Sequence, residues 1–299
     1  MTVGPFAYKA RNYAVRSLFK ALGAHPSSAP YVTGDGFRAM AHRRLEQGDR
    51  LDGRRVAAGD IVFVKSDELP RFRDEVLPDI RERFVLVSHN SDWTIDERYV
   101  DIADNPKVVR WFAENAILRH EKIQALPIGL ENRRLWNNGI VSDFDRLRPA
   151  SGDRKMRILY AFSVGTNRKE REPALEALRS HPLADGPAWT DSRRYRNTVV
   201  DYAFLASPPG NGFDCHRTWE ALYLGAIPIV KRSNFFDAFP GLPAIQVDDW
   251  REIQGWDEDF LRRSFEELSP RIADCPYLRL DYWARRLEEC RGRIHDGLG

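Results

Sequence analysis

The chain has 299 residues, which is enough for one large domain or two small ones. Its formal net charge of +2 gives no electrostatic argument for binding nucleic acid. The three cysteines show neither metal-ligand spacing nor a disulfide framework, which fits a reducing compartment, so we expect a cytoplasmic protein.

The first segment predicts a basic amphipathic helix over residues 7–22. Its apolar positions could line one side: Tyr8, Val15, Leu18, Phe19 and Leu22. Four basic residues precede the first acidic residue of the chain: Lys9, Arg11, Arg16 and Lys20. Such a helix can lie on an anionic membrane, which would give a peripheral contact at the inner face through residues 7–22. Packing on the protein body is the expectation we favour, because an apolar stripe usually faces a core.

Residues 59–127 alternate between apolar strand patterns and helical patterns. The predicted strands cover residues 61–65, 84–88, 108–111 and 122–127. The predicted helices of the N-terminal half cover residues 37–45 and 70–82. Near-continuous apolar strands alternating with helices are typical of a parallel sheet. We therefore assign residues 1–150 to an N-terminal Rossmann-like domain that includes the basic helix.

Two candidate general bases follow the predicted strand over residues 84–88. His89 and Asp92 lie in the segment SHNSDW, just past the carboxyl end of that strand, where sites form in open α/β sheets. Either side chain can take a proton from a hydroxyl group. The alternative is structural, with Asp92 capping the next turn and His89 hydrogen-bonded within the loop. The sequence leaves both interpretations open.

Residues 128–153 predict the connection between two domains, because they are rich in Asn, Gly, Asp and Arg and have few periodic apolar positions. The segment contains an Asp-x-Asp pair, Asp143 and Asp145, which we interpret as loop residues.

Residues 151–299 predict a second α/β domain. A strand over residues 157–162 leads into a loop with Ser163 and Arg168, and a helix follows over residues 169–179. A basic residue at such a helix start can bind an anion, although a solvated arginine is the equally weighted alternative. Asp191 is expected to cap a further helix, after a strand near residues 188–189. A strand over residues 244–247 and helices over residues 260–268 and 278–294 close the fold.

The most informative stretch is residues 202–231, YAFLASPPGNGFDCHRTWEALYLGAIPIVK. It predicts a strand over 202–206, a loop over 207–212, a helix over 215–224 and a strand over 226–230. Asp214 stands where the helix N-cap is expected, and Gly225 stands where the helix should end. Such a βαβ unit carries its ligand site, where it has one, in the loop after the first strand.

The loop and first helical turns of this stretch have the composition of a nucleotide-diphosphate site. Backbone N–H groups of Gly210, Asn211 and Gly212, next to a helix N-terminus, attract phosphate. Arg217 can add a bidentate contact to a phosphate group. Glu220 cannot favour phosphate, but its carboxylate can accept hydrogen bonds from two ribose hydroxyls. The alternative is an ordinary crossover, with Arg217 and Glu220 as a solvated pair.

The segment FLASPPGNGFDCHRTWEALYLGAIPIV resembles the signature of exostosin-like glycosyltransferases. In that family an apolar strand, a Pro-Gly loop, an Asp-x-x-Arg and a Glu-Ala-x-x-x-Gly-x-Ile-Pro-Val run form the sugar-nucleotide site. The resemblance implies an α/β fold of GT-B type, in which two Rossmann-like domains with parallel sheets face a central cleft. It also implies that residues 151–299 bind the donor and that residues 1–150 form the acceptor side. Many GT-B enzymes are similar in placing a basic residue from the first loop of the C-terminal domain on the diphosphate, here Arg168.

Together these features predict a metal-independent glycosyltransferase that transfers a hexosyl or pentosyl group. The resemblance implies inversion at the anomeric carbon and a role in polysaccharide or surface-glycan biosynthesis. The donor is expected to be a UDP- or GDP-linked sugar, used as substrate without a cofactor. The acceptor is expected to be a glycan or glycolipid. The catalytic candidates are Asp92 and His89. The donor-binding candidates are Arg217, Glu220, Arg168, Gly210, Asn211, Gly212, Asp214 and Ser163.

Three alternatives remain at this point. A nucleotide- or glycan-binding protein without transferase activity would keep Arg217 and Glu220 but lack a base. A metal-dependent transferase of GT-A type would use Asp143 and Asp145 to hold a divalent cation. A dinucleotide-dependent oxidoreductase is disfavoured, because the loop lacks the full Gly-x-Gly-x-x-Gly spacing.

Overall fold

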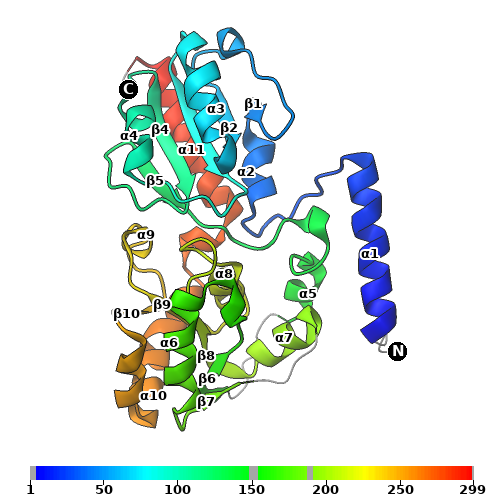
Figure 1. The fold of residues 1–299 in the computed structure, drawn as a ribbon, viewed down its shortest axis with the longest axis vertical. Helices are drawn as coiled ribbons and strands as arrows, with labels where there is room; N and C mark the ends of the chain where they lie inside the picture. Colours follow the sequence, from blue (N-terminus) through cyan, green and yellow to red (C-terminus); the bar gives the residue numbers. More distant parts are fainter. Residues whose placement is uncertain (1–4, 148–153, 187–190, 298–299) are drawn as a thin grey trace.

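The computed structural model describes residues 5–147, 154–186 and 191–297, which form two α/β halves (Figure 1). Each half is built on a five-stranded parallel sheet. The first sheet has the order β1-β2-β3-β4-β5: β1 Arg43–Leu45, β2 Ile61–Lys65, β3 Phe84–His89, β4 Val108–Glu114 and β5 Ile123–Leu126. The second has the order β10-β9-β8-β6-β7: β6 Lys155–Tyr160, β7 Ala184–Asp185, β8 Tyr202–Ser207, β9 Ile227–Lys231 and β10 Ile245–Val247. The predicted fold class is confirmed in its main feature, two α/β halves that are each built on a parallel sheet.

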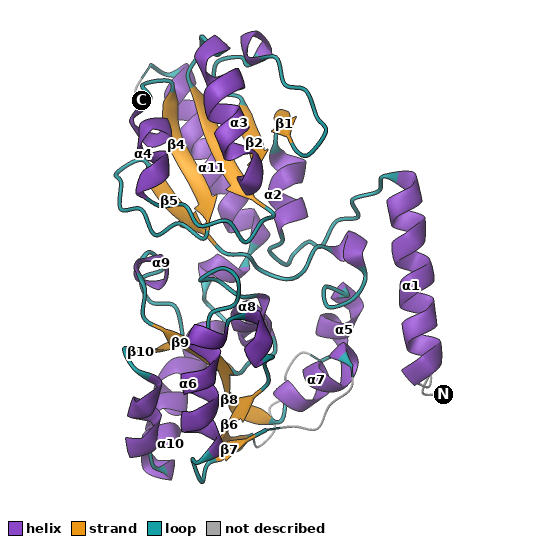
Figure 2. Cartoon of the chain, viewed as in Figure 1, coloured by secondary structure: helices purple, strands orange, loops and turns teal. Residues whose placement is uncertain are grey.

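Helices cover both sheets (Figure 2). In the N-terminal half they are α1 Pro5–Leu22, α2 Gly34–Met40, α3 Leu69–Arg71, α4 Val100–Asp104 and α5 Val141–Arg146. In the remainder of the chain they are α6 Arg168–Arg179, α7 Ser192–Val199, α8 His216–Tyr223, α9 Asn234–Asp237, α10 Glu258–Leu268 and α11 Leu280–His295. Because neighbouring strand residues point to opposite faces, Val62 and Val64 pack in one apolar cluster while Ile61 and Phe63 pack in another.

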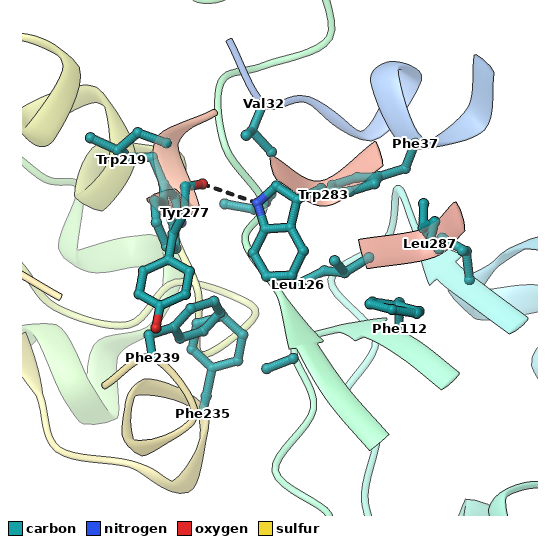
Figure 3. Packing of buried hydrophobic residues seen from close by; sticks show 14 of the residues in the cluster. Val32, Phe37, Phe112, Leu126, Trp219, Phe235, Phe239, Tyr277, Trp283 and Leu287 are labelled. Atoms are coloured by element: carbon teal, nitrogen blue, oxygen red, sulfur yellow. Dashed lines mark hydrogen bonds between the residues drawn. The ribbon is translucent and has the colours of Figure 1, made fainter. Parts of the chain in front are cut away.

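The two halves share an apolar core at their junction (Figure 3). Trp283 of α11 lies at its centre and donates from its indole nitrogen to the carbonyl of Tyr277, 3.1 Å away. Trp219 of α8 and Phe239 belong to the same cluster as residues of the first sheet. An interface of this kind buries apolar surface that would otherwise be exposed, so it holds the two sheets in a defined relation.

Three sequence-based boundaries differ from the structure. The division near residue 150 separates the two sheets, yet α11 returns from the C-terminal half and packs against β3 and β4. The predicted helix over 37–45 is wrong in its second part, because Arg43–Leu45 pairs with β2 as an edge strand. The predicted helix over 70–82 is a series of short helical turns that end at Asp79, after Pro78. The strand expected near 188–189 lies outside the described residues.

Helix α1 lies apart from both sheets and against the segment that contains α5 and α7 (Figure 1). Its inner side packs through Tyr8, Asn12 and Phe19, and the ring of Phe19 lies 5.6 Å from that of Trp136. The expected packing on the protein body is confirmed for Tyr8 and Phe19, whereas Leu18 and Leu22 of the predicted apolar stripe are exposed. Within the described residues, no helix has both the length and the apolar character needed to cross a membrane.

Candidate active site

The main cavity lies between the two halves and has a volume of about 670 Å³. Its C-terminal wall comes from the loop after β8 and the first turns of α8, and its N-terminal wall includes residues that follow β3 and β5. This position, at the carboxyl ends of parallel strands, is where open α/β sheets form sites. The cavity brings together these predicted residues: Asp92, Gly210, Asn211, Gly212, Asp214, Arg217 and Glu220. His89, Ser163 and Arg168 do not line it.

The glycines of the loop after β8 allow other groups to approach closely. A Cβ atom on Gly212 would lie 2.6 Å from Nδ2 of Asn115, a buried residue of the N-terminal half. A Cβ atom on Gly210 would lie 3.0 Å from Nη2 of Arg171. The Gly210 carbonyl accepts a hydrogen bond from Nδ2 of Asn167, at 2.7 Å. The loop is therefore held between Arg171 of its own half and Asn115 of the N-terminal half.

Arg217 brings a positive charge into the main cavity. Its guanidinium forms no ion pair with any carboxylate that the structure describes, and its Nε atom is buried without a hydrogen-bond acceptor. Leaving such a buried donor unsatisfied costs about 1–3 kcal/mol, and more for a charged group. A phosphate or carboxylate bound in the cavity would provide the counter-charge for this guanidinium.

Glu220 follows Arg217 by one helical turn and is buried at the cavity wall. Burial raises the pKa of its carboxyl, and the charges of His216, Arg196 and Arg217 oppose that rise. The pair is thus not the solvated surface pair that an ordinary crossover would show. A buried carboxyl group at this position can accept or share hydrogen bonds with ligand hydroxyls.

Asp214 joins the two halves of the protein. Its carboxylate accepts hydrogen bonds from the backbone of Ile128, at 2.7 Å, and from the indole of Trp219, at 2.8 Å. Its own backbone N–H donates to Oδ1 of Asn115, at 2.9 Å. Burial raises the pKa of the carboxyl to about 8, against the opposing effect of the hydrogen bonds. The prediction of Asp214 as helix N-cap is wrong by one residue, because the N-cap of α8 is Cys215. The carboxyl group of Asp214 instead binds the backbone of Ile128 in the N-terminal half.

Helix α6, which follows the loop after β6, contributes Arg171 to the cavity rather than Arg168. Arg168 is on the surface, with 75% of its side chain exposed and its guanidinium 3.6 Å from Glu172. Arg171, one turn further along α6, is buried and lines the main cavity. It donates to the carbonyls of Pro209 and Ser163, at 2.8 and 2.9 Å. The structure thus uses Ser163 through its backbone, as a support for Arg171.

His89 is buried beside Glu114 rather than free in the main cavity. Nδ1 of His89 accepts from the backbone of Asn90 at 2.7 Å and lies 3.0 Å from Oε2 of Glu114, while Nε2 lies 3.1 Å from the carbonyl of Pro127. Burial lowers the pKa of His89 to about 4 and raises the pKa of Glu114 to about 8. Near pH 7 both side chains are therefore neutral, with Nδ1 of His89 accepting from the Asn90 backbone and Nε2–H donating to the carbonyl of Pro127. Both ring nitrogens have hydrogen-bonding partners within the protein. His89 therefore has the structural role that was the alternative to a general base.

Asp92 is exposed and stands where the main cavity meets a second one. This side cavity, of about 220 Å³, is lined by Glu114, Glu131 and Asn132 among others. The carboxylate of Asp92 accepts a hydrogen bond from Nδ2 of Asn211 across the cleft, at 3.0 Å. An exposed carboxylate at this junction can reach ligands in either cavity.

His216 is a site residue that the sequence interpretation missed. It lines both cavities, and its Nδ1–H donates to the carbonyl of Gly129 at 2.8 Å. Its Nε2 has no hydrogen-bonding partner among the residues described. The sequence feature that could have identified His216 is its position directly before Arg217, in the helical turn that is predicted to bind a ligand. Glu114 was also missed, although it ends the strand next to the one that His89 ends.

The Asp143 and Asp145 side chains have separate structural partners. Asp143 is paired with the fully buried Arg196 and accepts from the hydroxyl of Tyr8 at 3.1 Å. Asp145 accepts from the hydroxyl of Tyr31 at 2.8 Å. Across residues 5–147, 154–186 and 191–297, no group of three or more His, Cys, Asp or Glu side chains is arranged to hold a metal ion. Asp143 thus ties α1, α5 and α7 together, and both aspartates lie in α5 rather than in a loop as expected.

Sequence comparisons give no match, either to a protein-family model or to a curated protein. The structure is similar to that of alpha,alpha-trehalose 6-phosphate synthase from Burkholderia multivorans, with 8% identity, a TM-score of 0.47 and coverage of 99% of this chain and 77% of the other. The structure is also similar to the catalytic domain of starch synthase IV from Arabidopsis thaliana, bound to ADP and acarbose. The identity is 11% and the TM-score is 0.37, and the match covers 88% of this chain and 78% of the other. A third similar structure is a GtfA/B complex, with 13% identity and a TM-score of 0.40. The match covers 79% of this chain and 58% of that chain, so this chain spans little more than half of its length.

Proposed function

We propose that this chain is an inverting glycosyltransferase that moves a sugar from a nucleotide-sugar donor to a glycan acceptor. The observation that carries the proposal is Arg217, a cation in the main cavity whose Nε is buried without an acceptor. A donor diphosphate provides the anionic oxygens that such a guanidinium binds best. The signature residues around Arg217, from Gly210 to Glu220, line the same cavity.

The C-terminal wall would hold the donor. Backbone N–H groups of the loop over residues 210–212 and the guanidinium of Arg217 would contact the diphosphate, with Arg171 fixing the loop from behind. Glu220 would bind the ribose hydroxyls. A UDP- or GDP-linked hexose or pentose is the donor we infer, with no resident metal or organic cofactor.

Transfer would take place at the junction between the two cavities. An acceptor hydroxyl attacks the anomeric carbon, its proton passes to Asp92, and the bond from that carbon to the diphosphate oxygen breaks. The nucleoside diphosphate then leaves with the bonding electron pair, and Arg217 stabilises its added negative charge, an electrostatic contribution that is often the largest in catalysis. Attack from the side opposite the leaving group inverts the anomeric centre.

His216 is the second candidate base, because it lines both cavities and its Nε2 has no partner in the described part of the chain. The acceptor would be a glycan or glycolipid, which places the reaction in polysaccharide or surface-glycan synthesis. A nucleotide-binding protein without transferase activity would bind the same donors and release no nucleotide.

The test is a thermal-shift screen of UDP-, GDP-, CMP- and dTDP-sugars, with and without EDTA, on the wild type and on Arg217→Ala. One class of donor is expected to raise the melting temperature of the wild type equally in both buffers. Arg217→Ala is expected to weaken binding of that donor by roughly 10–100-fold, since a charged hydrogen bond is lost. Arg168→Ala is the matched control, because that arginine is exposed and outside the cavity.

Nucleotide release in the presence of a glycan acceptor then separates an enzyme from a binding protein. Unchanged donor binding in Arg217→Ala would contradict the proposed site. A stabilising shift that EDTA abolishes would contradict the metal-free mechanism.

A further inference from the structure

A third cavity runs along α1, about 340 Å³ in volume. One wall is the helix itself, through Lys9, Asn12, Tyr13 and Arg16 among others. The opposite wall is formed by residues 135–138 together with residues 191–192 at the start of α7. We call this cavity the α1 groove.

Two polar atoms in the lining of the α1 groove lack partners. Asn12 is only 8% exposed, and its Oδ1 has no hydrogen-bond donor among the described residues. The indole nitrogen of Trp136 is also buried without an acceptor in the part of the chain that is described. The groove lining therefore contains a buried acceptor and a buried donor without partners, and a hydroxyl group can act as partner to either.

The charge of the groove is positive. Lys9 and Arg16 are exposed, lie about two turns apart on the same flank of α1, and form no ion pair with any described residue. The one carboxylate in the lining is Asp191, which caps α7 through the backbone of Arg194, at 2.9 Å, and lies 4.0 Å from the Arg194 guanidinium. An anionic ligand would thus meet two uncompensated cations and one carboxylate that is already engaged.

Aromatic side chains complete the groove. Tyr13 is 75% exposed although it lines the cavity, so its ring presents a free face. Trp136 is fixed between the ring of Phe19 and the guanidinium of Arg133, whose central carbon lies 5.6 Å from the indole centroid. Exposed aromatic faces can pack on the apolar side of a sugar ring.

We propose that the α1 groove binds an anionic saccharide, a sugar ring that carries a phosphate or a carboxylate. Asn138, Asp191 and Ser192 line both the α1 groove and the main cavity, so a chain of sugars could extend from one into the other. The bound saccharide is accordingly the part of the acceptor that lies away from the reacting hydroxyl, an assignment that rests on the proposed function. Binding itself requires no donor, so the two proposals fail separately.

The test is ligand-observed NMR titration of the full chain with glucose 6-phosphate, glucuronate and uncharged glucose. At least one of the two anionic sugars is expected to bind, and glucose to bind at least about tenfold more weakly, because the charged contacts are absent. The phosphate and carboxylate arms show which anion the groove prefers. Lys9→Ala and Arg16→Ala are expected to lose most of this binding. Arg11→Ala is the matched control, because Arg11 is an exposed base on α1 that does not line the groove.

The absence of binding by both anionic sugars would overturn the proposal. Equal loss in Arg11→Ala and Arg16→Ala would also overturn it, because the bases would then act as a general cationic face. Sedimentation with vesicles of phosphatidylcholine and phosphatidylglycerol addresses the membrane alternative. Vesicle binding that needs Arg11 and Arg16 alike, without saccharide binding, would assign the helix to a lipid surface instead. In transfer assays, Arg16→Ala is expected to raise the KM for an anionic acceptor while leaving kcat and the donor KM unchanged.

Discussion

The two walls of the main cavity differ in how the chain builds them. Most of the C-terminal wall comes from one continuous segment, from Gly210 to Glu220. The N-terminal side of the site is assembled from separate segments: Asp92 follows β3, Glu114 ends β4, and Ile128 and Glu131 follow β5. Residues of one continuous segment form a pattern that can be recognised in the sequence. The residues of the facing wall come together only when the first sheet folds.

The walls also differ in charge. The C-terminal wall holds Arg217, a cation without a counterion among the described residues. The N-terminal side holds the His89–Glu114 pair, which burial keeps neutral by lowering one pKa to about 4 and raising the other to about 8. One wall therefore suits an anion. The other suits hydroxyl groups and the handling of a proton, with Asp92 as its exposed carboxylate.

The largest effect is expected from Asp92→Asn. The change removes the basic carboxylate but keeps an oxygen that can accept the hydrogen bond from Asn211. Turnover should fall by roughly 10²–10⁴-fold, the usual contribution of a positioned base, while donor affinity stays unchanged. Steady-state kinetics together with donor titration would measure both quantities.

His216→Gln is the companion change. If it abolishes turnover and Asp92→Asn does not, the base is His216 and the carboxylate serves only to contact Asn211. Normal turnover in both variants would remove the catalytic role from this side of the site altogether.

A smaller effect is expected from Glu114→Gln, measured as stability against pH. In the native protein Glu114 keeps its proton up to about pH 8, whereas in the unfolded chain it ionises near the ordinary value of 4.5. Between these values the folded state binds more protons, so this group makes the unfolding free energy fall as pH rises. His89 acts in the opposite direction only below its ordinary pKa of 6.5. Asp214, whose pKa is also raised to about 8, acts in the same direction as Glu114 between pH 6.5 and 8, so the Glu114 contribution is the part of the decrease that a Glu114 variant removes.

Glu114→Gln imitates the protonated carboxyl and should remove a decrease of about 2 kcal/mol across that interval. Denaturant unfolding at several pH values would show a flatter profile for the variant than for the wild type. Glu121→Gln changes an exposed carboxyl and should leave the profile as it is. Parallel profiles for Glu114→Gln and the wild type would mean that Glu114 is already ionised in the folded protein.

The same contrast explains how far the sequence could be interpreted. Apart from the edge strands β1 and β7, the strands were predictable, as were the βαβ unit over residues 202–231 and the glycine at its helix end, because each depends on local periodicity and turn chemistry. The position of Arg217 and Glu220 on this helix was predictable for the same reason, and their role in donor binding stays a prediction. The sequence interpretation chose Arg168, whereas the residue that lines the cavity is Arg171, one turn further along the helix. Local spacing does not show which arginine of a helix faces the cavity.

Long-range features could not be predicted in this way. The pairing of Glu114 with His89 depends on two neighbouring strands ending at the same edge, and the use of Asp214 depends on Ile128 and Asn115 from the other half. The return of α11 to the first sheet likewise follows from tertiary packing around Trp283. Periodicity identifies an amphipathic helix but does not say which sheet it covers.

The smallest of the expected effects tests whether the two walls are held together at Gly212. In Gly212→Ala the new Cβ would lie 2.6 Å from the carboxamide of Asn115, which is fully buried and accepts from the backbone of Asp214. The clash should cost about 1–2 kcal/mol of unfolding free energy, within the usual range for overpacking. Denaturant unfolding should show a lower midpoint with an unchanged m-value.

A double-mutant cycle with Asn115→Gly separates this contact from a general effect of alanine in the loop. Asn115 has a φ of 52°, so glycine fits its backbone and removes the carboxamide. On that background Gly212→Ala should cost close to nothing, because the opposing atoms are gone. If Gly212→Ala lowers the unfolding free energy equally on both backgrounds, the loop itself requires glycine at this position. The close approach of Asn115 would then not explain the glycine.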